Sequence, residues 1–204
     1  LGVYRDCGGG GCPLLLTGFR HRFSPLVRKI ADQMARRTNP VVLACRINTA
    51  AVIGGDVIPA GAIGGDAGGI FSEMADLFTF LTGAPVRSVT AEKAGSRENS
   101  AVTIGFADGS VATLTVTSLG APGYPAQALE VFCDGAVLTL KNDAEYRGYG
   151  AVDATADEAA GEGGLSMSVF ADALLHGGPW PIPLWQQVQA MKITCLARER
   201  LGDK

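Results

Sequence analysis

Apolar residues recur with helical spacing in two stretches of the first half of the chain. Ser24-Pro25 precedes the first stretch and is typical of a helix start, because serine caps helices and proline suits the first helical position. The second stretch is followed by Gly83, a residue type that commonly ends helices. The pattern predicts a helix that begins at Pro25 and stops near Thr38, and another over about 67–82. The inward positions of the first helix are expected to be Leu26, Val27, Ile30 and Met34.

Alternating, β-branched segments dominate the middle of the chain, and a period of two is typical of half-buried strands. Asp108-Gly109 and Asp134-Gly135 are two-residue turn signals, so the segments that flank each of them are expected to pair as hairpins. Two other apolar runs, 13–19 and 40–50, also predict buried strands. The strands predicted in the middle region are 86–94, 100–107, 110–119, 127–134 and 136–143.

Two helices are predicted to close the chain, over about 165–176 and 184–201. Small residues without a clear period predict surface loops over 51–65 and 153–164. The order of helix, strand, helix, run of strands and final helices favours an α+β fold with a mostly antiparallel open β-sheet. In the last helix, the side chains expected to point inward are Leu184, Val188, Met191, Ile193 and Leu196.

Composition excludes several classes of protein. Of 204 residues, 47% are hydrophobic and 18% are charged, so the chain can form a sizeable core. The net charge of −3 and the lack of a basic stripe argue against nucleic acid as a partner. No apolar run is long enough to cross a bilayer, so no membrane partner is expected. The N-terminus lacks the layout of a signal peptide, and five scattered cysteines favour reduced thiols in the cytoplasm.

Motifs for metals and nucleotides are weak. The two histidines, His21 and His176, and the spacing of Cys7 and Cys12 predict no conventional metal site. The segment CGGGGCP precedes a predicted strand rather than following one, which a dinucleotide-binding loop would do. The segment GGDAGG has no strand directly before it and no acidic ribose partner behind it. Neither a metal nor an independent nucleotide site is therefore predicted.

Two carboxylates, Glu73 and Asp76, interrupt the apolar helix predicted over 67–82. Because they are three residues apart, they share one face of that helix. Buried carboxylates are costly without partners, so the pair either faces a polar cleft or braces another part of the structure. In a cleft, burial and mutual repulsion would separate their pKa values for general acid–base work. Glycoside hydrolysis is a weaker possibility, because two carboxylates on one helix rarely flank a glycosidic bond.

A basic segment, Arg20-His21-Arg22, comes shortly before the predicted helix start at Pro25. Helix N-termini favour negative charge, so this segment suits an anionic or hydroxyl-rich ligand. A solvated basic turn is an equally good interpretation. His21 taken alone is more typical of a surface or hydrogen-bonded histidine than of a catalyst.

Five motifs follow one another along the chain: GFRHRFSP, DLFTFLTG, FADGSVATLTVTSLG, ALEVFCDGAVLTL and GGPWPIP. Together, over about 13–203, they resemble the C-terminal domain of the Gfo/Idh/MocA oxidoreductases, in the branch of nucleotide-sugar and inositol-type dehydrogenases. The resemblance implies a substrate-binding domain over 13–204, after a flexible remnant or linker over 1–12. It also implies that the Rossmann domain and its EKP lysine lie upstream. NAD(P) is thus expected for the full-length protein, with no cofactor in this chain, which would be inactive alone.

The resemblance also implies site residues. The family helix usually carries a histidine that acts as acid/base for the substrate hydroxyl, followed three residues later by an aspartate. Here Asp76 matches the aspartate, whereas Glu73 replaces the histidine, so both are candidate catalytic residues. A glutamate would need a pKa raised by roughly two units, about 2.7 kcal/mol, to do the same work. Burial against Phe71, Met74 and Phe78 is expected to supply it. Substrate contacts are implied for Arg20, Arg22, Arg46 and Asn48.

Domains of this family commonly pack their open sheet against another subunit, which implies a homo-oligomer. The alternating strands fit helices on one face and a partner on the other, and a sheet with one solvated face fits them equally well. The implied function is the substrate-binding and oligomerisation domain of an NAD(P)-dependent sugar or cyclitol dehydrogenase. A non-catalytic binding or scaffold module derived from that family is the alternative, because the histidine is missing.

Overall fold

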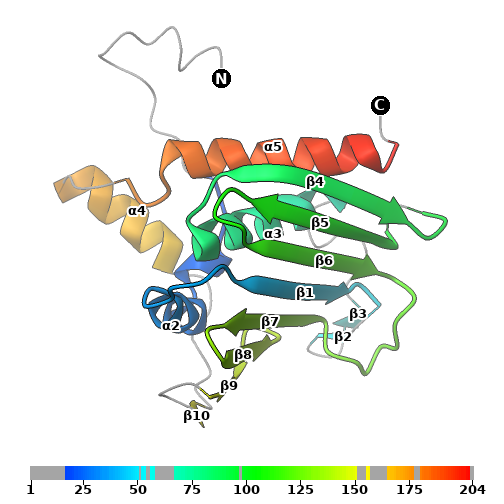
Figure 1. The fold of residues 1–204 in the computed structure, drawn as a ribbon, viewed down its shortest axis with the longest axis horizontal. Coiled ribbons are helices and arrows are strands. Elements are labelled where there is room, and N and C mark those ends of the chain that lie inside the picture. Colours follow the sequence, from blue (N-terminus) through cyan, green and yellow to red (C-terminus); the bar gives the residue numbers. More distant parts are fainter. Residues whose placement is uncertain are drawn as a thin grey trace, which may run out of the picture.

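A computed structural model describes residues 17–50, 52–53, 56–57, 67–96, 98–150, 155–156, 165–176 and 180–202. One large sheet and the helices packed on it make up the structure (Figure 1). The α+β class and the mostly antiparallel open sheet predicted from the sequence are confirmed. The strands of the main sheet are β1 (Val42–Asn48), β4 (Val86–Lys93), β5 (Ser100–Phe106), β6 (Val111–Thr117), β7 (Gln127–Cys133), β8 (Ala136–Lys141), β9 (Glu145–Tyr149) and β10 (Thr155–Ala156).

The eight strands lie in the order β10-β9-β8-β7-β1-β6-β5-β4. The central strand β1 pairs in parallel with β6 and antiparallel with β7, and the remaining neighbours pair antiparallel. The two predicted turn signals join β5 to β6 and β7 to β8. Asp134 and Gly135 both have positive φ, at 44° and 84°, as the favoured two-residue turn of a β-hairpin requires. A separate short ladder pairs β2 (Val52–Ile53) with β3 (Asp56–Val57).

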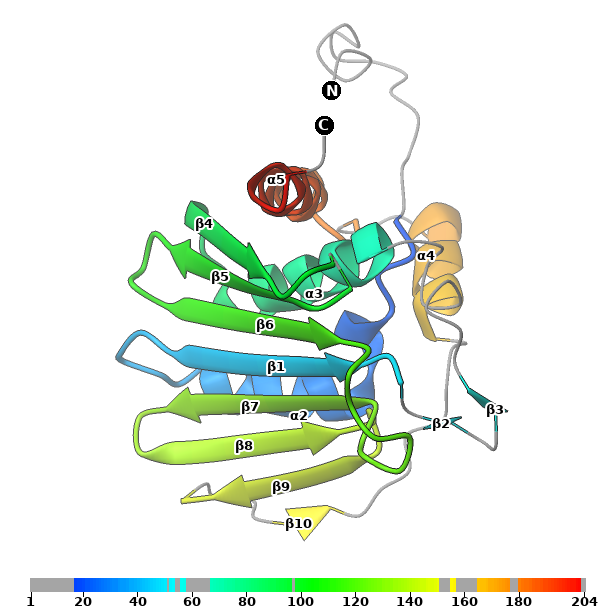
Figure 2. The same ribbon diagram turned by 90° about the vertical axis from the view of Figure 1, so that its right-hand side faces the viewer.

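The register buries one face of the sheet. Leu43, Cys45 and Ile47 of β1 face the core, whereas Val42 is 48% exposed. The Sγ atom of Cys45 lies 3.6 Å from the Sδ atom of Met74, so the buried face packs against the helix that carries Glu73. Figure 2 views the opposite, open face, with the helices α2 (Pro25–Met34) and α3 (Ala67–Thr82) behind the strands.

The first two helices form where the pattern predicted them. α2 begins at Pro25 and buries the four expected apolar side chains, although it ends at Met34, a few residues before the predicted stop. α3 ends at Thr82, and Gly83 follows with a φ of +66°, the left-handed conformation that glycine adopts at helix C-termini. A short 3-10 helix, η1 (His21–Phe23), links the start of the described chain to α2.

The last helix, α5 (Leu184–Arg200), packs against α3 and along the edge strand β4 (Figures 1 and 2). The predicted inward set was partly wrong, because Leu184 and Met191 are 38% and 48% exposed. Glutamines occupy the buried side instead: Gln189 donates to Ala84 O and to Thr79 Oγ1, and accepts from Val86 N. These hydrogen bonds satisfy the backbone where α3 ends and β4 begins, so a polar side chain is stable there. The remaining helix, α4 (Leu165–His176), lies beside the start of α5 (Figure 1).

The structure differs from three other predictions of secondary structure. Residues 17–20 form no strand, so the described part of the predicted strand 13–19 was wrong, and residues 13–16 lie outside the described residues. β9 was missed, because its short sequence EYRGY has two charged residues and a glycine and carries little strand signal. Parts of the two predicted loops, 52–53 with 56–57 and 155–156, are short strands. The predicted linker 1–12 and its two cysteines lie outside the described residues.

Candidate functional site

The basic segment and the carboxylate helix meet in space, although they are about fifty residues apart in sequence. η1 packs against α3, which places the Arg20-His21-Arg22 segment beside Glu73 and Asp76. Charged side chains of both signs thus gather at one place between η1 and α3, but the two carboxylates lie in different surroundings.

Asp76 is part of a buried ion pair. Arg22 Nε donates to Asp76 Oδ2 at 2.8 Å, and Arg22 Nη2 donates to Asp76 Oδ1 at 2.5 Å. Arg22 Nη1 donates to Gln186 Oε1 of α5 at 2.7 Å, and the guanidinium lies over the Phe80 ring. Burial raises the pKa of the Asp76 carboxyl, and the hydrogen bonds and charge of Arg22 oppose that rise. Arg22 is 2% exposed and Asp76 is 1% exposed, so the pair ties η1, α3 and α5 together rather than facing solvent.

His21 is buried between two carboxylates. Its Nε2 atom lies 3.1 Å from Glu73 Oε2, and its Nδ1 atom lies 2.9 Å from Oδ2 of Asp143, which follows β8. Burial by itself would lower the pKa of the imidazole, but the close contacts with Asp143 and Glu73 and their negative charges outweigh it and raise the pKa to about 9. His21 therefore carries a positive charge at neutral pH.

Glu73 is the accessible carboxylate of the pair. Its side chain is 29% exposed, and Arg20, which is 64% exposed, places Nε 4.0 Å from Glu73 Oε2. The carboxylate thus lies between two cationic side chains, with access to solvent. The burial predicted for Glu73 was wrong, because its side chain is 29% exposed, whereas Phe71, Met74 and Phe78 are core side chains of α3.

Arg46 and Asn48 do not join this cluster. Both lie on β1 and brace the connection between β6 and β7. The Arg46 guanidinium stacks on the Tyr124 ring and donates to Pro125 O, and Asn48 donates to Ala121 O. Glycine is required at position 120, because a Cβ atom there would overlap Asn48 Oδ1. The structure therefore brings four of the six predicted site residues together and gives the other two structural contacts.

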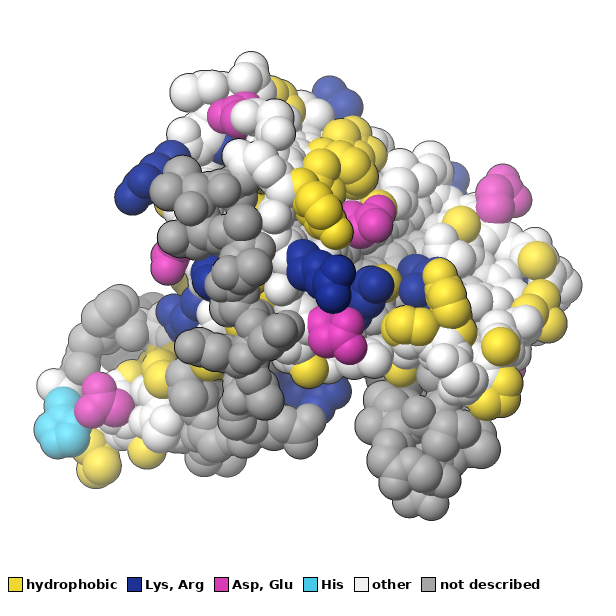
Figure 3. All heavy atoms as spheres, turned by 90° about the horizontal axis from the view of Figure 1, so that it is seen from below, with side chains coloured by type: hydrophobic (Ala, Val, Ile, Leu, Met, Phe, Trp, Pro, Cys, Tyr) yellow, Lys and Arg dark blue, Asp and Glu magenta, His cyan; other side chains and the backbone are white. Residues whose placement is uncertain are grey.

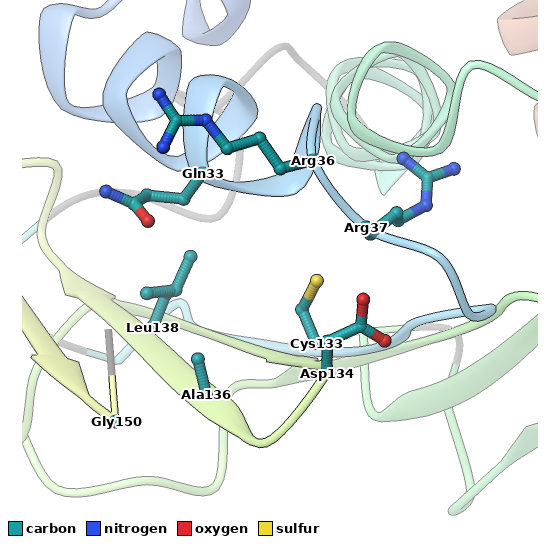
Figure 4. A pocket seen from close by; sticks show the side chains of 8 residues that line it. All are labelled: Gln33, Arg36, Arg37, Cys133, Asp134, Ala136, Leu138 and Gly150. Atoms are coloured by element: carbon teal, nitrogen blue, oxygen red, sulfur yellow. The ribbon is translucent and has the colours of Figure 1, made fainter. Parts of the chain in front are cut away.

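A shallow cavity of about 180 Å³ lies elsewhere, between the end of α2 and the β7–β8 hairpin (Figure 4). Two of the charged side chains that line it, Arg37 and Asp134, already make hydrogen bonds within the protein. Arg37 donates to Thr82 O and Asp108, and Asp134 accepts from Thr38 and Asn39. In the space-filling view of Figure 3, positive and negative side chains alternate with hydrophobic ones, with no broad field of one charge among the coloured atoms.

Features for other kinds of site are absent from the described residues. Within the described ranges, no group of three or more His, Cys, Asp and Glu side chains is arranged to hold a metal ion. The described helices include none that is both long and apolar enough to span a membrane. A dinucleotide-binding unit needs a helix between two parallel strands. Among the described residues, β1 and β6 form the one parallel pair, and the next element after each of them is a strand, so these residues do not form such a unit. The first half of the glycine-rich segment GGDAGG lies outside them, and the second half, 67–69, is the start of α3.

His21 makes stability depend on pH. Its pKa is about 9 in the folded protein, against an ordinary value of 6.5. Its stabilising contribution is therefore complete below about pH 6.5 and is lost as the pH rises through about 9. We expect the free energy of unfolding, from urea denaturation, to fall by on the order of 3 kcal/mol over that window. The decline should disappear in His21→Gln and persist in His176→Gln, and equal slopes in all three proteins would contradict the assignment.

Sequence reasoning missed two members of this cluster. Asp143 comes from the turn between β8 and β9, whose position beside η1 depends on how the whole sheet is ordered. Gln186 lies on the side of α5 that the apolar pattern did not select. His21 was interpreted as a surface or hydrogen-bonded histidine, and of these the surface position was wrong, because the side chain is 4% exposed and has a carboxylate near each ring nitrogen.

The fold is similar to that of several solved dehydrogenases, whereas no family model and no curated protein matches the sequence. UDP-N-acetylglucosamine 3-dehydrogenase GnnA from Acidithiobacillus ferrooxidans superposes with a TM-score of 0.73 at 16% identity, over 92% of this chain and 61% of that one. GenD2 from gentamicin A biosynthesis, solved with NAD, gives a TM-score of 0.63 at 17% identity, over 91% and 61%.

WlbA from Bordetella pertussis, solved with NADH and UDP-GlcNAcA, gives a TM-score of 0.62 at 12% identity, over 89% of this chain and 59% of that one. The chain thus spans about three fifths of the length of the structures it matches. At these identities the likeness establishes the fold. The fold of this chain is that of the C-terminal domain of the Gfo/Idh/MocA-type dehydrogenases, as the series of sequence motifs indicated.

Proposed function

We propose that this chain is the substrate-binding and oligomerisation domain of an NAD(P)-dependent sugar or cyclitol dehydrogenase. The observation that carries the proposal is the partly exposed carboxylate of Glu73, which α3 holds beside Arg20 and His21. An accessible carboxylate beside a guanidinium provides both an acceptor and donors for sugar hydroxyl groups. Two of the similar structures support a ligand of this class: GnnA is a UDP-N-acetylglucosamine 3-dehydrogenase, and WlbA was solved with UDP-GlcNAcA.

In this proposal the site residues divide into two roles. Glu73 and Arg20 contact the substrate, and Glu73 exchanges a proton with its reacting hydroxyl. Arg22 and Asp76, which are almost fully buried, fix η1 on α3 and thereby hold Arg20 and Glu73 in place. NAD(P) would be held by another part of the full-length protein and would supply the hydride acceptor, since the described residues form no dinucleotide-binding unit.

A binding titration of the 204-residue chain tests the proposal. We expect UDP-N-acetylglucosamine or a cyclitol such as myo-inositol to bind in calorimetry, and Glu73→Ala to weaken that affinity by about tenfold, as loss of a charged hydrogen bond does. Glu98→Ala, on the exposed turn between β4 and β5, is the matched control. NADH should not bind to the chain. Stoichiometric NADH binding, or ligand affinity unchanged in Glu73→Ala, would contradict the proposal.

The open face of the sheet is proposed as the surface for a second copy of the chain. Val42, Phe132, Val137 and Tyr149 are neighbours across four strands and form an apolar row on this face. Three of them are between 42% and 56% exposed. On the same face, Thr90, Thr103 and Thr113 are neighbours across β4, β5 and β6. A flat sheet face of this kind suits packing against its own copy about a two-fold axis.

We expect the wild-type chain to be a dimer or larger species in multi-angle light scattering. Phe132→Arg should shift it to monomer, because the new charge would be buried in the interface without a partner. Glu98→Arg introduces the same side chain at an exposed turn and should leave the mass unchanged. A monomeric wild-type chain would refute the proposed interface.

The alternative is a binding or scaffold module without catalysis. It is favoured by one observation, the glutamate at the position where the resemblance implies a histidine. Both proposals predict ligand binding by the isolated chain, so they are separated only by turnover.

A further inference from the structure

Three separate elements hold the buried imidazole of His21. η1 carries His21 itself, α3 supplies Glu73 on the Nε2 side, and the turn between β8 and β9 supplies Asp143 on the Nδ1 side. His21 is 4% exposed, whereas the side chains of Glu73 and Asp143 are 29% and 31% exposed. The cluster is therefore a buried cation between two carboxylates that reach solvent. We call Glu73, His21 and Asp143 the carboxylate clamp.

The position of Asp143 is fixed by the hairpin turn between β8 and β9. Asn142 and Asp143 both have positive φ, at 50° and 54°, and Ala144 N donates to Lys141 O to close the turn. Non-glycine residues adopt this conformation at a cost, so it persists where surrounding contacts enforce it. Those contacts come from Gln127 at the start of β7, which exchanges backbone and side-chain hydrogen bonds with Asn142. The sheet thus presents Asp143 to the imidazole in a defined position.

The clamp also orients Glu73. The closest contacts of His21 and of Arg20 with this residue both involve Oε2, so Oε1 is the oxygen more distant from the two cations. An imidazolium with a carboxylate at each nitrogen can rotate neither toward solvent nor toward the core without losing a charged contact. The partly exposed carboxylate is therefore held in one orientation with one oxygen available.

We infer that Asp143 and His21 position Glu73 so that its carboxylate accepts a hydrogen bond from a hydroxyl group of the bound substrate. This inference rests on the proposed function and names the residues that prepare its site. His21 acts through Glu73 and is a positioning residue, and Asp143 in turn fixes His21. The ligand chemistry is that of a polyhydroxylated ring, because an ionised carboxylate only accepts hydrogen bonds and a sugar or cyclitol donates them.

The pH dependence follows from the charges around the imidazole. Glu73 of α3 and Asp143 of the β8–β9 turn face it directly, and Arg20 approaches the same Glu73 oxygen as His21. The Arg22–Asp76 pair lies next to it on η1 and α3. With a pKa of about 9, His21 is charged at neutral pH and loses its charge in mildly alkaline solution. The anchor on Glu73 weakens at that point, so affinity for the substrate should fall over the same range of pH.

Nuclear magnetic resonance tests the clamp without any ligand. The chain has only two histidines, and His176→Gln assigns their signals, since His176 lies on the exposed surface of α4. We expect His21 to titrate near pH 9 in the wild-type chain and about one unit or more lower in Asp143→Asn, a change at a half-exposed side chain. The carboxyl carbon signal of Glu73 should shift in step with His21 in the wild type and should show no such shift in His21→Gln.

Binding provides the second readout. The affinity for UDP-N-acetylglucosamine should fall by about tenfold between pH 7.5 and pH 10 in the wild type, whereas His21→Gln should bind weakly at both values. Three results would each overturn the inference. His21 could titrate near pH 6.5, the Glu73 carboxyl carbon signal could stay constant while His21 titrates, or His21→Gln could bind with wild-type affinity. If the clamp signals behave as expected but no sugar or cyclitol binds, the proposed function fails, and with it the substrate role of the clamp.

Discussion

Asp76→Ala is expected to lower the free energy of unfolding by about 3–5 kcal/mol, the largest single effect on stability in this cluster. The change leaves the Arg22 guanidinium buried at 2% exposure, with Gln186 and the Phe80 ring as its remaining partners among the described residues. An uncompensated buried charge costs more than the pair itself contributes, because both ions were desolvated during folding. Urea denaturation followed by circular dichroism measures the change.

Two controls separate charge from packing. Arg20→Ala removes a guanidinium that is 64% exposed in the same segment and should change stability by less than about 1 kcal/mol. The double variant Arg22→Met with Asp76→Leu replaces both ions by apolar side chains and should recover much of the loss. If Asp76→Ala is as stable as the wild type, the buried ion pair does not have the bracing role assigned to it.

Glu73→Gln is expected to reduce turnover by about 10²–10⁴-fold in a protein that joins this chain to its cofactor-binding half, the range typical of a lost general acid–base. The amide keeps the shape of the side chain and its contact with Arg20 but cannot accept the hydroxyl proton. Turnover is measured as NADH formation from nucleotide sugars and cyclitols. Glu98→Gln should leave turnover unchanged, since this side chain is exposed on the β4–β5 turn.

The same assay separates the enzyme from the scaffold. An active wild-type protein whose Glu73→Gln variant turns over normally would remove the proton-transfer role from Glu73. If no substrate is oxidised by the wild type but Glu73→His creates turnover, the domain is a binding module that lost its catalyst. The histidine variant places a second imidazole beside His21, so its activity should be compared at several pH values.

Sequence reasoning succeeded where structure is local. The helix that carries Glu73 and Asp76 is marked by an apolar run and Gly83, and the β7–β8 hairpin by Asp134-Gly135, and both formed with nearly the predicted bounds. α5 shows the limit of apolar patterns, because Gln189 is stable inside through hydrogen bonds that a sequence pattern does not encode.

The candidate site was predictable only in part for the same reason. Spacing placed Glu73 and Asp76 on one helix face. Of the two explanations left open for them, the brace applies to Asp76 through its buried pair with Arg22, whereas a substrate cleft at the partly exposed Glu73 stays a prediction. Their partners come from distant segments: Arg22 is 54 residues away from Asp76, and Gln186 is 164 residues from Arg22. A local sequence pattern spans far fewer residues than these separations, so the burial of His21 and the contribution of Asp143 could not be foreseen.

The central position of β1 has a consequence for how the chain reaches this fold. Hairpins such as β5–β6 and β7–β8 join neighbours in sequence, whereas β1 contacts β6 at a separation of 70 residues, as between Leu43 and Thr113. Bringing such distant partners together carries a large loop-closure entropy before any contact compensates it. The two hairpin groups are therefore expected to form early, and insertion of β1 between them to govern the folding rate, so a ribosome must release β6 and β7 before the sheet can close.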